Sequence, residues 1–391
     1  MKISSIEVFV IGNPWKNWVL VKVVTDEGIY GWGDATCGLS SQPVVAAVRE
    51  IRRLCIGRDP RDIEALWDNA HKGLYLTANG ILLSALAGIS TACWDILGKF
   101  LGVPLYTLFG GRMNPKLRAY ANGWYQGPRN PDAFGERATA VVKMGYTALK
   151  FDPFGSNYRF LDAKERRLSL ELIAAVRRAV GEDVGILIEA HDRFTVPEAI
   201  RLAADLEEFN CEWLEAPVWS EDIPALRAVA ASSRVRIVAG ERFSTPRQFS
   251  DLIEGGRFDV VQPEYVELGG IAKLREVAAI ADAHGATVAP HNARCTLSTA
   301  VNVHVMTATR NFYIQETFDD FHVPWAHDMF RGVPRVVDGY LTASDVPGLG
   351  VEINESLFEQ HPYSEHHFLN LFAEGWEKRN ADSKPDAKER I

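Results

Sequence analysis

Apolar and polar residues alternate at the start of the chain in the pattern of β-strands. Residues 6–10 alternate, and the run WVLVKVVTDEGIYGWGDA (18–35) contains two further strand-like segments. Between these two segments lies Asp26-Glu27-Gly28, which has the composition of a hairpin turn. We therefore expect the chain to open with an antiparallel meander.

Helical spacing of apolar residues replaces this alternation further along. Residues 42–54 and 62–75 each show an amphipathic pattern. Residues 81–101 are nearly all apolar and are followed by Gly102 and Pro104, which are typical of the end of a helix. The strands and helices together predict an α+β unit in this part of the chain.

From Lys116 onward, strand-like runs alternate with amphipathic helical segments, which is the pattern of a parallel sheet. Eight alternations in about 200 residues match an α/β fold of the (β/α)8 barrel type. The last unit lacks a full helix of its own, so the expected form is a modified (β/α)7β barrel. The eight runs are LRAYANG, TALKFD, GILIEA, CEWLEAP, RIVAGE, DVVQPE, ATVAPH and NFYIQE.

The pattern becomes irregular again after Thr317. The run VPGLGVEI, which ends at Ile353, is expected to return as a strand and complete the N-terminal meander. From about residue 378 the chain is polar and charged, which predicts a loose tail.

Composition narrows the function classes. The hydrophobic fraction of 47% and the charged fraction of 24% are ordinary for a globular protein. A net charge of −9 gives no basic surface for nucleic acid or acidic membranes. The five cysteines are scattered without a CxxC pair, and no uncharged apolar run approaches the length of a membrane span. We expect the cysteines to be reduced thiols. The N-terminal residues are expected to form a strand and not a signal peptide, and the protein is expected to be cytoplasmic.

Three carboxylates recur at equal spacing within the predicted barrel. Glu189, Glu215 and Glu241 each end a short apolar run, and 26 residues separate each from the next. Equivalent strand ends meet at one edge of a parallel barrel, so these acids would converge. Converging carboxylates repel one another unless a cation joins them, and a set of oxygen ligands suits Mg²⁺. The alternative is a ring of solvated polar residues, but the regular spacing favours a metal site.

Two histidines stand near the ends of other runs. His191 follows Glu189 by two residues, so strand alternation points both side chains the same way if the strand continues that far. His291 ends the seventh run, across the barrel from the third, so the two imidazoles would face each other. Glu264 ends the sixth run, close enough to accept the second ring N–H of His291. The alternative for each histidine is a hydrogen-bonded surface residue.

The chain resembles a known family through several motifs. EAHDRF, WLEAP, AGER, VVQPE, APHN and IQE, in this order, resemble the enolase superfamily, mandelate racemase subgroup, and within it the acid-sugar dehydratases of the galactonate dehydratase type. LLSALAGISTACWDILGKFLGVPLYTLFGG and PGLGVEINE also resemble family segments. The resemblance implies an α+β capping domain at 1–115, a catalytic barrel at 116–320, and a C-terminal segment, 321–391, that returns to the capping domain.

The resemblance also implies roles for the strand-end residues. The three equally spaced glutamates would bind Mg²⁺. His291 would be the general base with Glu264 as its partner, and His191 would be the general acid. Glu316 would hydrogen-bond the enediolate oxygen and stabilise it.

Two departures from the family pattern bear on the reaction. Family members often carry Asp at the positions of Glu189 and Glu264, which keeps the chemistry and changes the reach. Racemases of the subgroup carry Lys-x-Lys at the second strand, where this chain has Lys150-Phe151-Asp152. The second base of a racemase is therefore missing, although Lys150 would serve if its side chain turned inward. Lys150 and Asp152 are otherwise expected to contact substrate.

The implied reaction is the dehydration of a sugar acid. His291 would remove the C2 proton of an aldonate, Mg²⁺ would stabilise the enediolate, and loss of the C3 hydroxyl would give a 2-keto-3-deoxy acid, which makes the enzyme a hydro-lyase. The alternatives are a racemase, epimerase or cycloisomerase of the same superfamily, and a non-catalytic sugar-acid binder.

By resemblance, the loop at residues 12–17 closes over the barrel mouth. Trp15 could stack on a sugar face, and Lys16 could meet a second carboxylate or hydroxyls. An ordinary exposed loop is the alternative. The resemblance further suggests a homo-oligomer, commonly an octamer, whose partner is a small sugar acid and neither nucleic acid nor membrane.

Overall fold

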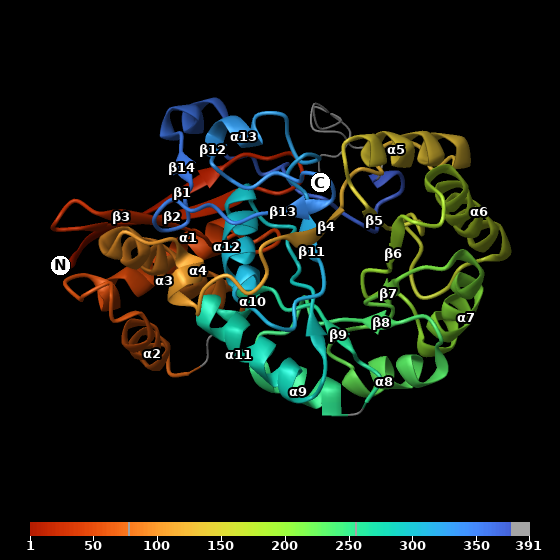
Figure 1. Ribbon diagram of the computed structural model, residues 1–391, viewed down its shortest axis with the longest axis horizontal. Coiled ribbons are helices and arrows are strands. Elements are labelled where there is room, and N and C mark those ends of the chain that lie inside the picture. The colour runs from red at the N-terminus through yellow and green to blue at the C-terminus, as the bar shows by residue number, and fades with distance from the viewer. Residues whose placement is uncertain (77–78, 255, 377–391) are drawn as a thin grey trace.

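The computed structural model describes residues 1–76, 79–254 and 256–376. This part of the chain contains the eight expected barrel strands (Figure 1). They are β4 (Leu117–Ala121), β5 (Ala148–Phe151), β6 (Gly185–Glu189), β7 (Trp213–Glu215), β8 (Ile237–Val238), β9 (Val260–Val261), β10 (Thr287–Val288) and β11 (Gln315–Thr317). The predicted strand order along the chain is confirmed.

The strands close into a ring. Parallel pairing runs in the order β11-β4-β5-β6-β7-β8, and β9 pairs with β10. Between β8 and β9, the Gln262 amide donates a hydrogen bond to Ala239 O at 3.0 Å. Between β10 and β11, the Tyr313 amide donates a hydrogen bond to Val288 O at 2.9 Å. These bonds satisfy backbone groups that an open sheet edge would leave unpaired.

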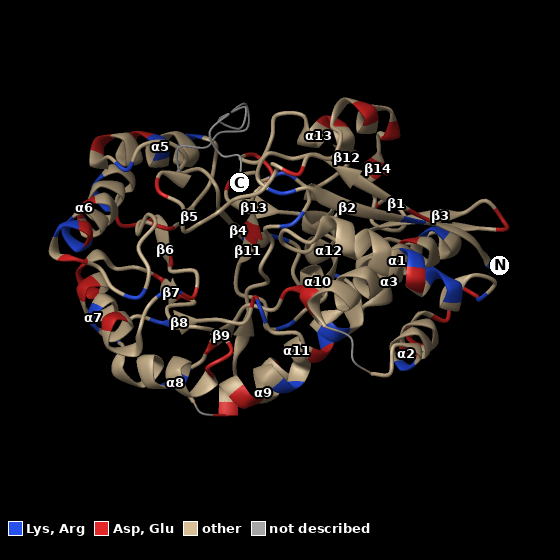
Figure 2. Ribbon diagram, turned by 180° about the vertical axis from the view of Figure 1, so that it is seen from behind, with Lys and Arg blue, Asp and Glu red and all other residues tan. Residues whose placement is uncertain are grey.

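Helices surround the ring on the outside (Figure 1). They are α5 (Pro131–Lys143), α6 (Ala163–Val180), α7 (Val196–Leu206), α8 (Ile223–Ser232), α9 (Pro246–Glu254), α10 (Tyr265–Leu268), α11 (Ile271–Ala283) and α12 (Thr296–Thr307). Side-chain caps fix several starts: Asp162 accepts from the amides of Lys164 and Glu165, both at 2.8 Å. Charged residues of both signs occur along α6 and α7 (Figure 2). No barrel helix follows β11 within the described residues, as the (β/α)7β pattern requires.

The barrel interior is filled by one side chain from each strand or its immediate flank. These buried residues form one cluster: Tyr120, Ala148, Leu187, Trp213, Val238, Val260, Ala289 and Ile314. Large rings from β4 and β7 meet edge to face, with the centroids of Tyr120 and Trp213 5.7 Å apart. The ring is therefore a packed core, and it forms a floor beneath whatever lies at the carboxyl ends of the strands.

The N-terminal residues fold as predicted. The meander is β1 (Ile3–Ile11), β2 (Trp18–Thr25) and β3 (Tyr30–Asp34), paired antiparallel in that order. The helices are α1 (Ser41–Cys55), α2 (Ile63–Gly73), α3 (Gly80–Leu101) and the short α4 (Leu105–Leu108). Together they form a unit beside the barrel (Figure 1).

Helix α3 packs directly on the backbone of β3. A Cβ on Gly31 would lie 2.0 Å from Ala92 O, and a Cβ on Gly33 would lie 2.0 Å from Gly88 O. Only glycine therefore permits this approach. By length and mean hydropathy (1.6) α3 would suffice to cross a membrane, but 72% of the apolar window is buried inside the fold. Packing thus accounts for its apolar composition.

The chain returns toward the N-terminal unit after the barrel. The elements are α13 (Ala326–Met329), β12 (Phe330–Arg331), β13 (Tyr340–Leu341), β14 (Glu352–Ile353) and the 3-10 helix η2 (Glu355–Gln360). The expected strand at the end of VPGLGVEI exists as β14, but the expectation that it completes the meander was wrong. β14 pairs with β12, because Phe330 and Arg331 lie opposite Ile353 and Glu352. The loose tail predicted from residue 378 lies outside the described residues.

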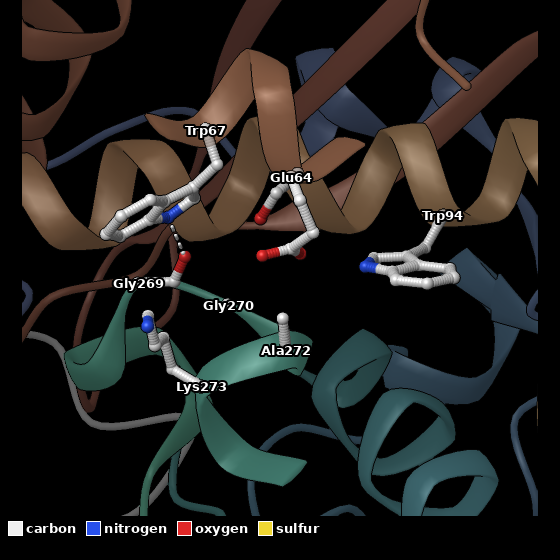
Figure 3. A pocket seen from close by; sticks show the side chains of 8 residues that line it. Glu64, Trp67, Trp94, Gly269, Gly270, Ala272 and Lys273 are labelled. Atoms are coloured by element: carbon white, nitrogen blue, oxygen red, sulfur yellow. Dashed lines mark hydrogen bonds between the residues drawn. The ribbon is translucent and has the colours of Figure 1, made fainter. Parts of the chain in front are cut away.

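Hydrogen bonds at several places join the N-terminal unit to the barrel. Asp34, at the end of β3, accepts from the Cys295 amide at 3.1 Å and from Ser298 Oγ at 2.6 Å, at the start of α12. On another part of this boundary the Trp67 indole donates to Gly269 O at 2.7 Å, beside Glu64 and Lys273 (Figure 3). The pocket that these residues line has a volume of about 10 Å³, roughly one water molecule. It is therefore a packing gap, too small for a substrate.

Candidate active site

One layer of polar side chains lies directly above the barrel floor. Successive residues of a strand face opposite sides, so a residue two positions after a floor residue points into the barrel as well. The residues two positions beyond the floor include Asn122, Lys150, Glu189, Glu215, His291 and Glu316. Five of these six were named from the sequence, and the structure brings them together at one end of the barrel.

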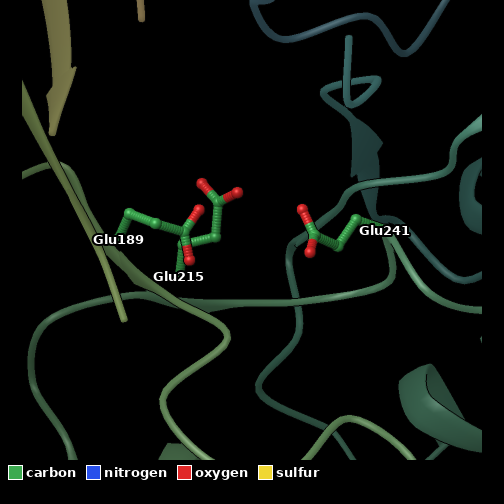
Figure 4. A group of neighbouring side chains, drawn as sticks. All are labelled: Glu189, Glu215 and Glu241. Atoms are coloured by element: carbon green, nitrogen blue, oxygen red, sulfur yellow. The ribbon is translucent and has the colours of Figure 1, made fainter. Parts of the chain in front are cut away.

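The three equally spaced glutamates converge, as expected. Glu189, Glu215 and Glu241 each offer a carboxylate oxygen, and these oxygens lie within 4.8 Å of one another. Figure 4 shows Glu189 and Glu215 side by side, with the carboxylate of Glu241 facing them. All three residues are buried. Glu241 lies three residues beyond β8, so it reaches the cluster from a loop.

The cluster fits a divalent cation. Burial raises the pKa of Glu189, and burial with repulsion from Glu189 raises the pKa of Glu215 well above its usual range. Burial acts on Glu241 too, but His291 and Arg242 more than offset it and lower its pKa. Negative charge at Glu189 and Glu215 is thus incompletely compensated by the protein. Three convergent carboxylates are also the hard oxygen donors that Mg²⁺ prefers.

Lys150 lies among the carboxylates and is buried. Its Nζ is 3.1 Å from Glu189 Oε2, 2.5 Å from Glu215 Oε1 and 3.0 Å from Glu316 Oε1. Burial opposes the ammonium, but Glu215 and Glu316 outweigh burial and raise the pKa of Lys150 well above its usual range. Lys150 is therefore a permanent cation that holds the acidic cluster together.

Glu316 is surrounded by hydrogen-bond donors. The Asn122 side-chain amide and the Asn292 backbone amide each donate to it at 2.7 Å. Burial would raise its pKa, but Lys150, His291 and these donors lower the pKa to about 2. A carboxylate in this state accepts hydrogen bonds and donates none. Both carboxylate oxygens of Glu316 thus have partners in the protein, and its expected hydrogen bond to an enediolate oxygen stays a prediction. Lys150 is the neighbouring donor that lines the cavity.

His191 is fixed by a buried carboxylate. Strand β6 ends at Glu189, and His191 has a φ of 49°, so the condition for strand alternation to orient His191, a strand that continues to it, is not met. Its orientation comes instead from its amide, which donates to Glu189 Oε1 at 2.8 Å, and from Nδ1, which lies 2.7 Å from Asp152 Oδ2. Its imidazole still lines the cavity.

Asp152 lies behind His191. Its carboxylate also accepts from Arg193, and Arg193 and His191 lower its pKa although burial opposes this. Asp152 is buried and is not among the residues that line the cavity. The expected substrate contact by Asp152 is therefore replaced by a role in orienting His191.

His291 has a similar support on the other side of the barrel. Its Nδ1 lies 2.9 Å from Glu264 Oε2, as expected, and its Nε2 lies 3.1 Å from Glu241 Oε2. Burial would lower the pKa of His291, but Glu241, Glu316 and Glu264 outweigh burial and raise it. Arg294 donates to Glu264 at 3.1 Å and keeps its carboxylate in place.

A cavity of about 480 Å³ opens above these groups. This volume lies within the range of small-molecule sites. Its walls include both catalytic candidates, His191 and His291, and the predicted substrate contacts Trp15 and Lys16. Because Trp15 and Lys16 line the cavity, the loop at residues 12–17 reaches the barrel mouth. Burial and Arg294 lower the pKa of Lys16 to about 8.

Sequence reasoning missed four supporting residues. They are Asn122, Arg193, Asn292 and Arg294. Arg193 and Asn292 stand inside the motifs EAHDRF and APHN, and Arg294 follows two residues later. Asn122 lies two residues after a floor residue, so strand alternation would have found it. Arg193 and Arg294 could be predicted as supporting residues only if the buried carboxylates that they bind were already known.

Comparisons with known proteins agree with this architecture. Residues 8–110 match the family described as mandelate racemase / muconate lactonizing enzyme, N-terminal domain. Residues 133–357 match the family described as enolase C-terminal domain-like. The expectation of a capping domain and a barrel of this superfamily is thus confirmed.

Several relatives cover most of the chain. A D-gluconate dehydratase from Thermoproteus tenax is 37% identical over 349 residues, 89% of this chain and 70% of that protein. A D-gluconate/D-galactonate dehydratase from Picrophilus torridus is 33% identical over 96% of this chain and 97% of its own length. The solved structure of a mandelate racemase/muconate lactonizing enzyme from Jannaschia sp. CCS1 has a TM-score of 0.86 and 31% identity, covering 93% of this chain and 98% of that chain. The chain therefore belongs to the mandelate racemase/muconate lactonizing enzyme family of the enolase superfamily.

Proposed function

We propose that this enzyme is a Mg²⁺-dependent hydro-lyase that converts a six-carbon aldonate to a 2-keto-3-deoxy acid. One observation carries the proposal. Two imidazoles, His191 and His291, line one cavity with Glu189 and Glu241 of the glutamate cluster, and each has its Nδ1 held by a buried carboxylate. Relatives named as D-gluconate and D-galactonate dehydratases support the substrate class.

Glu189, Glu215 and Glu241 would hold the metal. When bound, Mg²⁺ supplies a Lewis acid that offsets negative charge on the substrate carboxylate. The protein adds a fixed cation of its own at Lys150, which lines the cavity. Its ammonium is held in place by three acids, so little rearrangement is needed as charge develops nearby.

His291 would act as the base. Glu264 Oε2 lies 2.9 Å from Nδ1 and fixes the ring, so Nε2, which lies 3.1 Å from Glu241 Oε2, is the nitrogen that would take the C2 proton. Nearby carboxylates raise the pKa of His291, which favours its taking a proton. Removal of the C2 proton by a positioned base contributes about 10²–10⁴-fold to the rate.

His191 would act as the acid. Asp152 holds Nδ1, so Nε2 is directed to the cavity and can carry the proton that is transferred. That proton joins the C3 hydroxyl, the C3–O bond breaks, and water leaves. The resulting enol becomes the 2-keto-3-deoxy acid when C3 takes a proton.

Epimerisation is the weaker candidate. It requires a second base on the opposite face of C2, and Lys150 is the candidate for that role. In the structure its ammonium is bound to three carboxylates and its pKa is raised, so it does not give up its proton readily. The remaining strand-two residue, Asp152, is committed to His191 and Arg193.

The test is a turnover screen with Mg²⁺ over four- to six-carbon aldonates and aldarates. We expect 2-keto-3-deoxy products from a six-carbon aldonate, detected by mass spectrometry, and loss of activity with EDTA. A His291→Asn variant should lose about 10²–10⁴-fold in kcat. Deuterium uptake at C2 in D₂O without dehydration would favour epimerisation, and wild-type activity in His291→Asn would exclude the catalytic assignment. We also propose a homo-oligomer in the cytoplasm, to be tested by light scattering and fractionation.

A further inference from the structure

We propose that the C-terminal strap, defined here as residues 361–376, forms one wall of the active-site cavity and limits the length of the sugar acid. Leu369 and Leu371 of the strap line the cavity together with His191 and His291. The strap lies more than 40 residues beyond the last barrel strand, β11. The inference rests on the proposed function, because it takes a sugar acid as the molecule in the cavity.

The first half of the strap is fastened to the loop at residues 12–17. The Gly12 amide donates to His361 O, and the Asn17 side-chain amide donates to Ser364 O, both at 2.8 Å. Lys16 forms an isolated antiparallel bridge with Phe368. The backbones approach closely, since a Cβ on Gly12 would lie 2.0 Å from Pro362 O.

The second half of the strap is fastened to the barrel. The Phe372 ring lies 5.5 Å from the Arg193 guanidinium carbon, and Arg193 in turn binds the carboxylate that holds His191. The buried Trp376 ring meets Tyr125, another residue that lines the cavity, with centroids 6.0 Å apart at 88°. These anchors hold the strap in place on the other side of the two leucines.

Leu369 and Leu371 therefore lie between two sets of anchors and face the cavity. Their side chains offer no donor or acceptor to a sugar hydroxyl. A longer acid that placed a hydroxyl against them would lose its hydrogen bonds to water without replacement, and it would also meet a steric limit. The two leucines thus exclude longer sugar acids, while polar groups elsewhere in the cavity bind the substrate.

The test compares a double variant, Leu369→Ala with Leu371→Ala, against Leu357→Ala. Leu357 lies in η2, is partly buried and does not line the cavity, so it controls for the loss of apolar volume. We expect kcat/KM for a seven-carbon aldonate, relative to a six-carbon aldonate, to rise about tenfold or more in the double variant and to stay unchanged in the control. Leu369→Phe, which narrows the same wall, should lower this ratio.

A second measurement does not depend on turnover. Calorimetric binding of both acids with Mg²⁺ is measured in a His291→Asn background, with folding checked by circular dichroism. Unchanged length selectivity in both the double variant and Leu369→Phe would overturn the inference. Absence of turnover in the wild-type enzyme would instead overturn the proposed function, while the binding ratio would still report on the wall.

Discussion

Replacing Lys150 by methionine should make the stability of the protein depend on Mg²⁺. The substitution keeps the length of the side chain and removes the only ammonium within 3.1 Å of both Glu189 and Glu215 among the described residues. Removing one partner of a buried ion pair typically costs about 3–5 kcal/mol, because the other charge remains buried without compensation. We expect a loss of this size in the free energy of unfolding, measured by urea titration in EDTA.

Mg²⁺ should restore part of that loss. The ion would supply positive charge to the same carboxylates, so the cost of removing the Lys150 ammonium falls when metal is bound. A coupling of about 1–3 kcal/mol between the two cations would make the variant bind Mg²⁺ about 5–150-fold more tightly than the wild type. Calorimetry measures the Mg²⁺ affinity of the variant and the wild type. Urea titrations with saturating Mg²⁺ measure how much of the free energy of unfolding the metal restores.

Lys99→Met serves as the matched control. Lys99 binds the buried Asp95 at 2.7 Å within α3, away from the carboxylate cluster. Its loss of stability should be the same with EDTA and with Mg²⁺. Equal losses for the Lys150 variant under both conditions, together with unchanged Mg²⁺ affinity, would refute the view that the ammonium and the metal share the three acids.

Three further predictions follow from buried partners. Asp152→Asn should lower kcat about 10–100-fold through the orientation of His191, with Mg²⁺ affinity unchanged by calorimetry. Glu264→Gln should lower kcat by a similar factor through His291, and an unaltered kcat would reject the pairing. Burial lowers the pKa of His304 to about 4. The unfolded chain therefore binds this proton first, and stability should fall by on the order of 3 kcal/mol between about pH 6.5 and pH 4. His304→Gln should remove that part of the pH dependence in urea titrations, and an identical pH profile would contradict the assignment.

Periodicity in the sequence predicted the barrel and much of the chemistry. The spacing of strand-like runs is a local property, and period-two alternation decides which side chains face inward. The equal spacing of Glu189, Glu215 and Glu241 therefore sufficed to predict their convergence. The same rule, counted from Tyr120, would have placed Asn122 in the inward-facing layer that contains Glu316.

The errors fall where tertiary contacts override local pattern. β14 was expected beside the meander because its sequence is strand-like, but a two-residue strand carries no information about its partner. Asp152 was expected to touch substrate because it stands at a strand end. Its carboxylate is instead neutralised by Arg193, 41 residues away along the chain, and no periodicity predicts such a pair.

The cavity thus draws its chemistry and its shape from different parts of the chain. Proton transfer and metal binding depend on barrel residues whose positions follow from strand spacing. The size of the cavity depends on the loop at residues 12–17 and on the strap, which meet through hydrogen bonds that join residues about 350 positions apart. Changes in the loop or the strap can therefore alter substrate length while the glutamate cluster and the two imidazoles stay as they are. Differences in substrate among proteins with this barrel chemistry should accordingly lie in those two segments, where local pattern is least informative.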